Sequence, residues 1–84
     1  MTADYIRQEI LKAQPHAQIF DTTDTDGDRW LEWATQTKRL GFICGEGAVG
    51  WYFSSKETCK VGTLATLDLP LLLASMIEEK EVQQ

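Results

Sequence analysis

The alternation of apolar and polar residues between positions 18 and 64 constrains the fold of this chain more than any other feature. Short runs rich in aromatic and β-branched residues are separated by clusters of Asp, Gly, Ser, Thr and Lys. A period of two is typical of strands, and such clusters accept the backbone angles of tight reversals. The pattern predicts an antiparallel β-meander of four to five strands, at residues 18–20, 29–35, 40–44, 51–54 and 59–64.

Segments with helical periodicity flank this region on both sides. In residues 3–13 apolar side chains recur at helical spacing, and Thr2 stands where an N-cap is expected. A second apolar stripe follows Asp68, an N-cap candidate, and contains Pro70 where a first helical turn tolerates it. This stripe comprises Leu69, Leu72, Leu73, Met76 and Ile77. We therefore expect an α+β domain with an N-terminal helix, the sheet and a C-terminal helix, both helices packing on one face of the sheet.

Length and composition allow a single domain over residues 1–84. The chain is 43% hydrophobic and 25% charged, which is ordinary for a globular protein, and 84 residues are too few for two separate cores. The polar residues 79–84 are expected to fray.

Charge and apolar content argue against several classes of partner. The net charge is −5 and Lys and Arg do not cluster, so direct nucleic-acid binding is not expected. The longest apolar stretch, residues 67–77, is interrupted by Asp68, Pro70 and Ser75 and is too short to span a membrane. Residues 1–10 lack the apolar run of a signal peptide. The two cysteines do not form a disulfide scaffold, so we expect a cytoplasmic protein with reduced thiols.

An acidic loop runs from Asp21 to Asp28 and invites comparison with a calcium-binding loop. With Gly27 at the sixth position of such a loop, the third and fifth positions are Asp, but the first and twelfth are Thr22 and Trp33. An Asp-Gly pair is also a preferred hairpin connection. The loop is therefore expected to be a solvated turn, with weak binding of a hard cation as the alternative.

The turn from Gly45 to Gly50 matches the pattern G-x-G-x-x-G letter by letter. In dinucleotide-binding proteins this pattern precedes a helix whose N-terminus meets a pyrophosphate. Here the strand-like residues 51–53 follow instead. The glycines are expected to serve a hairpin turn, with small-ligand binding as the alternative.

No self-contained catalytic site is visible. The candidate nucleophiles are Cys44 and Cys59, and His16 is the one histidine. Cys44 alternates in phase with Leu40 and Phe42, which indicates burial, and a buried thiol is usually inert. These residues also lack the ligand spacing of a zinc site. We expect no enzyme activity, no metal and no cofactor.

The aromatic side chains carry the functional hypothesis. Alternation places Trp30 and Trp33 on opposite faces of their strand, and it places Tyr52 opposite its two aromatic neighbours. If both helices cover one face, the other keeps an apolar patch that favours a partner, because Tyr and Trp are enriched at binding hot spots. The candidate partner-binding residues are Trp30, Trp33, Ile43 and Tyr52. The alternative is that both faces are buried as ordinary core.

These observations favour a small acidic, non-catalytic protein that binds another protein or itself, as a homodimer, through an aromatic sheet face. It would act as a regulatory protein, an adaptor or an inhibitor whose acidic loop occupies a basic groove. The alternative from another class is a binder of small ligands or cations that uses the loop from Asp21 to Asp28 or the turn from Gly45 to Gly50.

Overall fold

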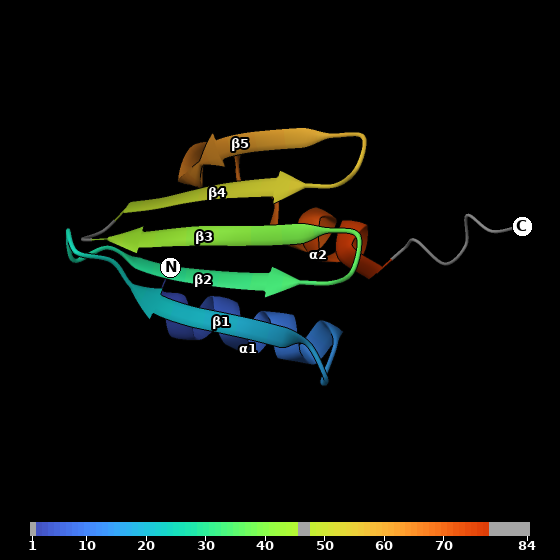
Figure 1. Cartoon of the computed structure of the whole chain (residues 1–84), viewed down its shortest axis with the longest axis horizontal. Coiled ribbons are helices and arrows are strands. Elements are labelled where there is room, and N and C mark those ends of the chain that lie inside the picture. Colours follow the sequence, from blue (N-terminus) through green and yellow to red (C-terminus); the bar gives the residue numbers. More distant parts are fainter. Residues whose placement is uncertain (1, 46–47, 78–84) are drawn as a thin grey trace, which may run out of the picture.

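The computed structural model describes residues 2–45 and 48–77, which form one sheet with helices packed against it (Figure 1). Within these residues the element order is helix, five strands, a 3-10 turn and helix, which confirms the α+β class. The elements are α1 (Ala3–Ala13), β1 (Gln18–Thr23), β2 (Arg29–Ala34), β3 (Arg39–Gly45), β4 (Ala48–Ser54), β5 (Cys59–Thr63), η1 (Leu64–Thr66) and α2 (Leu69–Ile77). The expected fraying of residues 79–84 lies outside the described residues.

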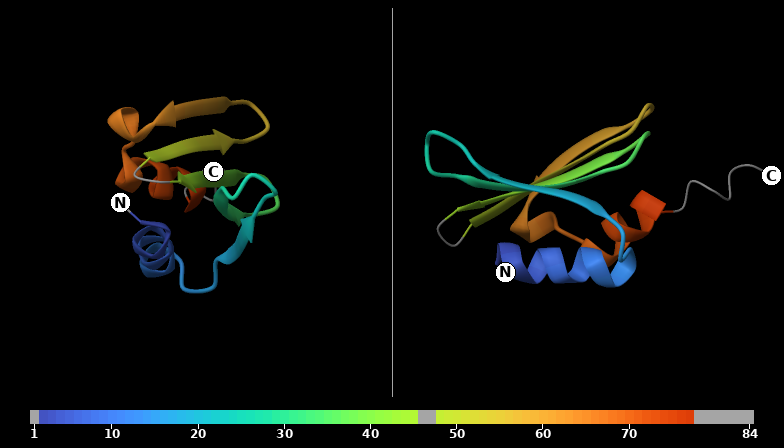
Figure 2. Two further views of the ribbon diagram at one scale, coloured as in Figure 1. Left: turned by 90° about the vertical axis from the view of Figure 1, so that its left-hand side faces the viewer. Right: turned by 60° about the horizontal axis from the view of Figure 1, so that its bottom comes forward.

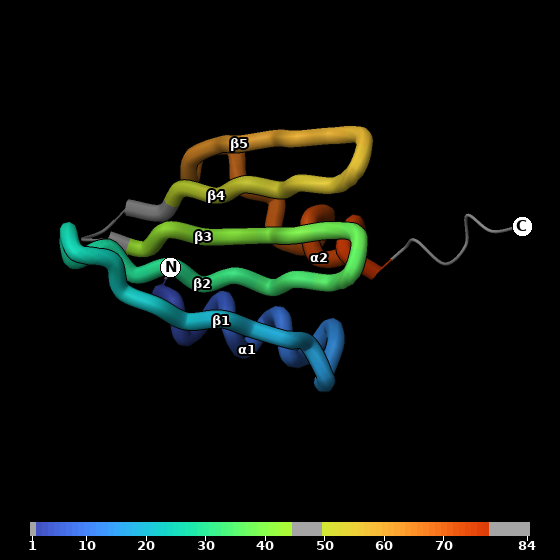
Figure 3. Tube along the Cα trace, in the orientation of Figure 1, coloured from blue at the N-terminus to red at the C-terminus, as the bar shows by residue number. Residues whose placement is uncertain are grey.

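The described strands form one antiparallel sheet in the order β1-β2-β3-β4-β5, so each strand pairs with its neighbour in sequence (Figure 3). The predicted meander is therefore confirmed. Its first hairpin is longer than expected, because Asp21, Thr22 and Thr23 continue the ladder opposite Leu31, Trp30 and Arg29. The turn itself is confined to the residues between Thr23 and Arg29.

Both described helices lie on the same side of the sheet, as expected (Figure 2). α1 contacts β2 and α2 contacts β3. The core between helices and sheet is apolar, and within the described part of the chain none of its buried residues is polar or charged. Its members include Ile6 and Ile10 from α1, Leu31, Trp33, Leu40, Phe42 and Phe53 from the sheet, and Leu69, Leu72, Leu73 and Met76 from α2.

Polar contacts at the helix ends fix where each helix begins and ends. The Thr2 hydroxyl accepts a hydrogen bond from the Tyr5 amide at 3.1 Å, and the Asp68 carboxylate accepts one from the Leu71 amide at 3.3 Å. Both residues thus act as the N-caps that the sequence indicated. Near the end of α2, the Lys38 ammonium donates to the Ser75 carbonyl at 2.6 Å, which places a cation at the negative end of the helix dipole.

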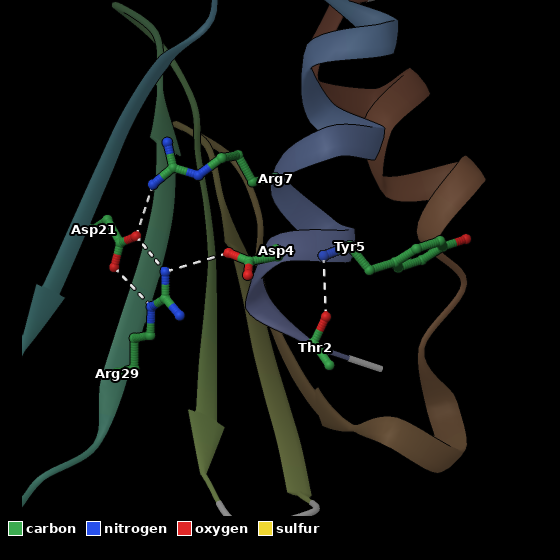
Figure 4. A network of polar contacts seen from close by, with 6 residues as sticks. All are labelled: Thr2, Asp4, Tyr5, Arg7, Asp21 and Arg29. Atoms are coloured by element: carbon green, nitrogen blue, oxygen red, sulfur yellow. Dashed lines mark hydrogen bonds and ion pairs between the residues drawn. The ribbon is translucent and has the colours of Figure 1, made fainter.

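A surface network of ion pairs joins α1 to the sheet near β1 and β2 (Figure 4). Asp21 accepts hydrogen bonds from Arg7 at 2.7 Å and from Arg29 at 3.0 and 2.7 Å. Arg29 also lies 3.6 Å from Asp4 of α1. The hydrogen bond from Arg29 is the main cause that lowers the pKa of Asp21 from 3.8 to about 2, and Arg7 adds to it.

We expect Asp21→Asn to make the free energy of unfolding depend less on pH in the acid range. The pKa of Asp21 is lower in the folded protein, so its contribution is present above pH 3.8 and is lost as the pH falls toward about 2. Because the carboxylate is near the surface, the loss at neutral pH should be about 1 kcal/mol or less. Urea unfolding between pH 2 and 7 measures it. Parallel profiles for the variant and the wild type would contradict this assignment.

Candidate binding face of the sheet

The side of the sheet that faces away from both described helices is called here the open face (Figure 2). The antiparallel register fixes its residues, because directly paired residues share a face. A middle row crosses the sheet through Phe20, Glu32, Gly41, Tyr52 and Val61. A second row, towards the β1–β2 loop, contains Thr22, Trp30, Ile43, Gly50 and Thr63, and a third, at the other end, contains Gln18, Ala34, Arg39, Ser54 and Cys59.

Three of the four predicted partner-binding residues come together on this face. Trp30 and Ile43 are directly paired across β2 and β3, and Tyr52 lies in the adjoining row; all three are partly buried. Trp33 does not belong to the site. It points to the helix side and is only 2% exposed, because alternation along β2 sends positions 30 and 33 to opposite faces.

Two apolar residues of the open face were not predicted from the sequence. Phe20 is 47% exposed and Val61 is 75% exposed, and they occupy the two ends of the middle row. The available signal was their register with the neighbouring strands, since Val61 pairs with Tyr52. Without a known pairing, an isolated Phe or Val in a short strand does not indicate its face.

A shallow pocket of about 230 Å³ lies on the β2–β5 part of the open face. Trp30, Ile43, Tyr52 and Val61 contribute to its lining. Gly50 also lines this pocket, and a Cβ atom there would lie 3.2 Å from the Ile43 methyl group. The pocket is smaller than the roughly 300–1,000 Å³ of typical small-molecule sites. Its size suits a single apolar side chain of a partner.

Tyr52 is held in place at the centre of the face. Its ring lies across Gly41, where a Cβ atom would collide with it, and its hydroxyl donates a hydrogen bond to the Glu32 carboxylate. Arg39 lies 3.5 Å from the same carboxylate. Burial, assisted by Glu32, raises the pKa of Tyr52 to about 12, so the phenol stays neutral and remains a donor. A ring fixed in this way loses little conformational entropy when a partner binds.

Trp30 is anchored by the acidic loop. Its indole N–H donates to Asp24 Oδ2 at 3.1 Å, while Asp24 Oδ1 accepts hydrogen bonds from the amides of Asp26 and Asp28 at 2.9 and 3.0 Å. The Trp30 hydrogen bond is the main cause that lowers the pKa of Asp24. Gly27 adopts a positive φ of 90°, as a tight reversal requires. Asp24 therefore organises a hairpin turn.

The sequence also offered two other candidate sites, a cation site in the acidic loop and a ligand site at the glycine-rich turn. Among the described residues, no three His, Cys, Asp or Glu side chains gather in a way that could hold a metal ion. Residues 46–47 of the glycine-rich turn lie outside the described residues. The turn is followed by the strand β4, not by the helix that a pyrophosphate site requires.

The thiols and the histidine are dispersed over the fold. Cys44 lies on the helix side, near the end of β3, and burial raises its pKa. Cys59 is exposed on β5, with β4 between the two thiols, and both are free. His16 is exposed and precedes β1, at the opposite end of the sheet from Cys44.

A second apolar surface lies in the helix layer. A groove of about 740 Å³ runs between α1 and α2, and Tyr5, Leu73 and Ile77 are among its lining residues. Outside the groove, Leu71 of α2 is 59% exposed. No polar anchor comparable with those of Tyr52 and Trp30 holds these side chains among the described contacts.

Comparisons with protein-family models, with curated proteins and with solved structures yield no match. None of the helices in the described part of the chain is both long and apolar enough to cross a membrane.

The two tryptophans of β2 should respond differently to truncation. Trp33→Ala removes a fully buried ring from the core and should lower the free energy of unfolding by about 3–5 kcal/mol. Trp30→Ala removes a partly exposed ring and one surface hydrogen bond, with an expected loss of about 1–2 kcal/mol. Urea unfolding followed by circular dichroism measures both. Equal losses of unfolding free energy in the two variants would contradict the burial of Trp33 on the helix side and the partial exposure of Trp30 on the open face.

Proposed function

We propose that this protein is a small, non-catalytic binding protein that docks a protein surface on its open face, as a regulatory protein, adaptor or inhibitor. One observation carries the proposal. Both described helices pack on one side of the sheet, and the other side keeps an aromatic and aliphatic patch at the surface. Its most exposed members, Phe20 and Val61, are 47% and 75% exposed.

The composition and stiffness of the open face support protein binding. Contiguous apolar patches are uncommon on soluble monomers unless another surface covers them. Aromatic residues with fixed orientation dominate binding energy at interfaces, and Trp30 and Tyr52 are both oriented by hydrogen bonds to carboxylates. Polar residues at the two ends of the strands supply the rim that such interfaces usually have.

Other classes of ligand find less support. The pocket on the open face is about 230 Å³, below the usual size for a small-molecule site, whereas the groove of about 740 Å³ between α1 and α2 lies within that range but is on the helix layer. Asp24, the central acid of the loop, is already engaged by Trp30 and by backbone amides. The net charge of −5 disfavours a nucleic acid. We further propose a reducing, cytoplasmic location, with which the free thiols Cys44 and Cys59 agree.

A comparative capture experiment tests this function. The immobilised wild type is incubated with native extract supplemented with untagged copies of the chain, in parallel with the double variant Phe20→Ser/Val61→Ser. We expect the double variant to retain about tenfold less of the bound protein, because truncating a hot-spot contact costs more than about 1 kcal/mol. Quantitative mass spectrometry provides the measurement.

Leu71→Ser serves as the matched control, since it removes a similarly exposed apolar side chain from the helix layer. It should retain the same protein at the wild-type level. The proposal is contradicted if the wild type retains nothing, or if the double variant retains what the wild type retains.

A further inference from the structure

Charges are distributed unequally along the strands of the open face. Because the strands alternate in direction, the β1–β2 loop lies at one end of the sheet and the β2–β3 and β4–β5 turns lie at the other. The first end carries Asp24, Asp26 and Asp28, and at the second end Arg39 and Lys56 are exposed together with one acid, Glu57. The face is thus acidic at one end, mostly apolar in the middle, where Glu32 is paired with Arg39, and more basic at the other end.

We propose that the open face binds a second copy of this chain, with a two-fold axis that lies in the interface and runs across the strands. This inference rests on the proposed function and names the partner. Such an axis reverses the strand direction between the copies. The acidic loop of each copy then faces the basic end of the other, near Arg39, and the two contacts are identical by symmetry.

The apolar members of the middle row are self-complementary under this axis, while Glu32, which also faces its own equivalent, is paired with Arg39 in each copy. Phe20 and Val61 lie close to the axis, so each faces its own symmetry equivalent. The row towards the β1–β2 loop faces the third row of the second copy. The bulky Trp30 therefore faces Ala34 of the second copy, and Ile43 faces the aliphatic stem of Arg39 of the second copy. Two copies of one sheet also have the same twist, so their facing surfaces can stay in contact along the strands in aligned packing.

Charge selects this axis over the other face-to-face arrangement. A two-fold axis along the strands would also place Trp30 over a small residue, Gly50 of the second copy. It would, however, put the acidic loops of both copies at the same end of the dimer and both basic ends together. Opposite potentials favour association and like potentials oppose it, which favours the axis across the strands.

The area of the face is sufficient for a weak dimer. Five strands spaced about 4.8 Å apart, each about 20 Å long, offer roughly 500 Å² per copy. The total of roughly 1,000 Å² is close to the lower limit for a specific interface.

Charge reversal across the symmetric contact tests the orientation. Asp26→Lys and Arg39→Glu each place like charges together at both contacts of their own homodimer. Each single variant should dimerise about tenfold less tightly than the wild type in sedimentation equilibrium. In an equimolar mixture, every contact again pairs opposite charges, and the dissociation constant should return to within about threefold of the wild-type value.

Restoration in the mixture would also show that both variants are folded. Lys12→Glu on α1 is the control, because it reverses one charge in the helix layer and should leave dimerisation unchanged. Single variants that dimerise like the wild type, or a mixture without recovery, would overturn the proposed axis.

Chemical cross-linking tests the same geometry without changing charge. In a Cys44→Ala/Cys59→Ser background, Phe20→Cys and Val61→Cys are each treated with a short bismaleimide, which bridges facing sheets about 10 Å apart. With the axis across the strands, both variants should cross-link to themselves in high yield. Leu71→Cys, on the helix layer, should give only the background level.

Each other pattern of cross-links overturns the inference. An axis along the strands brings Phe20 near Val61 of the second copy, so neither variant would link to itself. Edge-to-edge pairing through β1 would link only the Phe20→Cys variant to itself, and pairing through β5 would link only the Val61→Cys variant. A wild type that stays monomeric on the order of 100 micromolar also excludes the second copy as the occupant. In that case the capture experiment still decides whether the open face binds a different protein.

Discussion

The packing of both helices against one side of the sheet is the constraint on which the other features depend. Trp33, Leu31, Leu40 and Phe42 fill the space under α1 and α2, and these four side chains are at most 2% exposed. With a period of two, burying this set commits the intervening residues to the opposite face. Since no described element covers that face, the apolar residues there remain at the surface, where they cost solubility unless a partner covers them.

Sequence reasoning predicted the elements well, because their signals are local. The caps at Thr2 and Asp68, the strand alternation and the turn residues all act within a few positions, and the structure contains the corresponding elements. The assignment of side chains to faces needed long-range information. Trp33 was included in the site because alternation separates it from Trp30 but does not say which face the helices cover. Phe20 and Val61 were missed because their neighbours across the ladder are defined only by the strand register.

The two apolar surfaces of the molecule differ in how firmly their side chains are held. On the open face, Tyr52 rests on Gly41 and bonds to Glu32, and Trp30 bonds to Asp24, so two large rings have one orientation before any partner arrives. The raised pKa of Tyr52 and the lowered pKa of Asp24 reflect the same two contacts, with burial as the main cause at Tyr52. On the helix layer, Leu71 projects from a nine-residue helix without a comparable anchor. Preorganisation therefore favours the sheet face as the binding surface.

The proposed face-to-face dimer would also account for the placement of charge in a chain whose net charge is −5. Two acidic copies repel each other at long range, so association requires that opposite charges meet locally. The acidic loop and Arg39 stand at opposite ends of the sheet, which would allow them to meet twice in one symmetric interface. Such an interface would use the same surface on both copies, so it would close at two and add no further subunits.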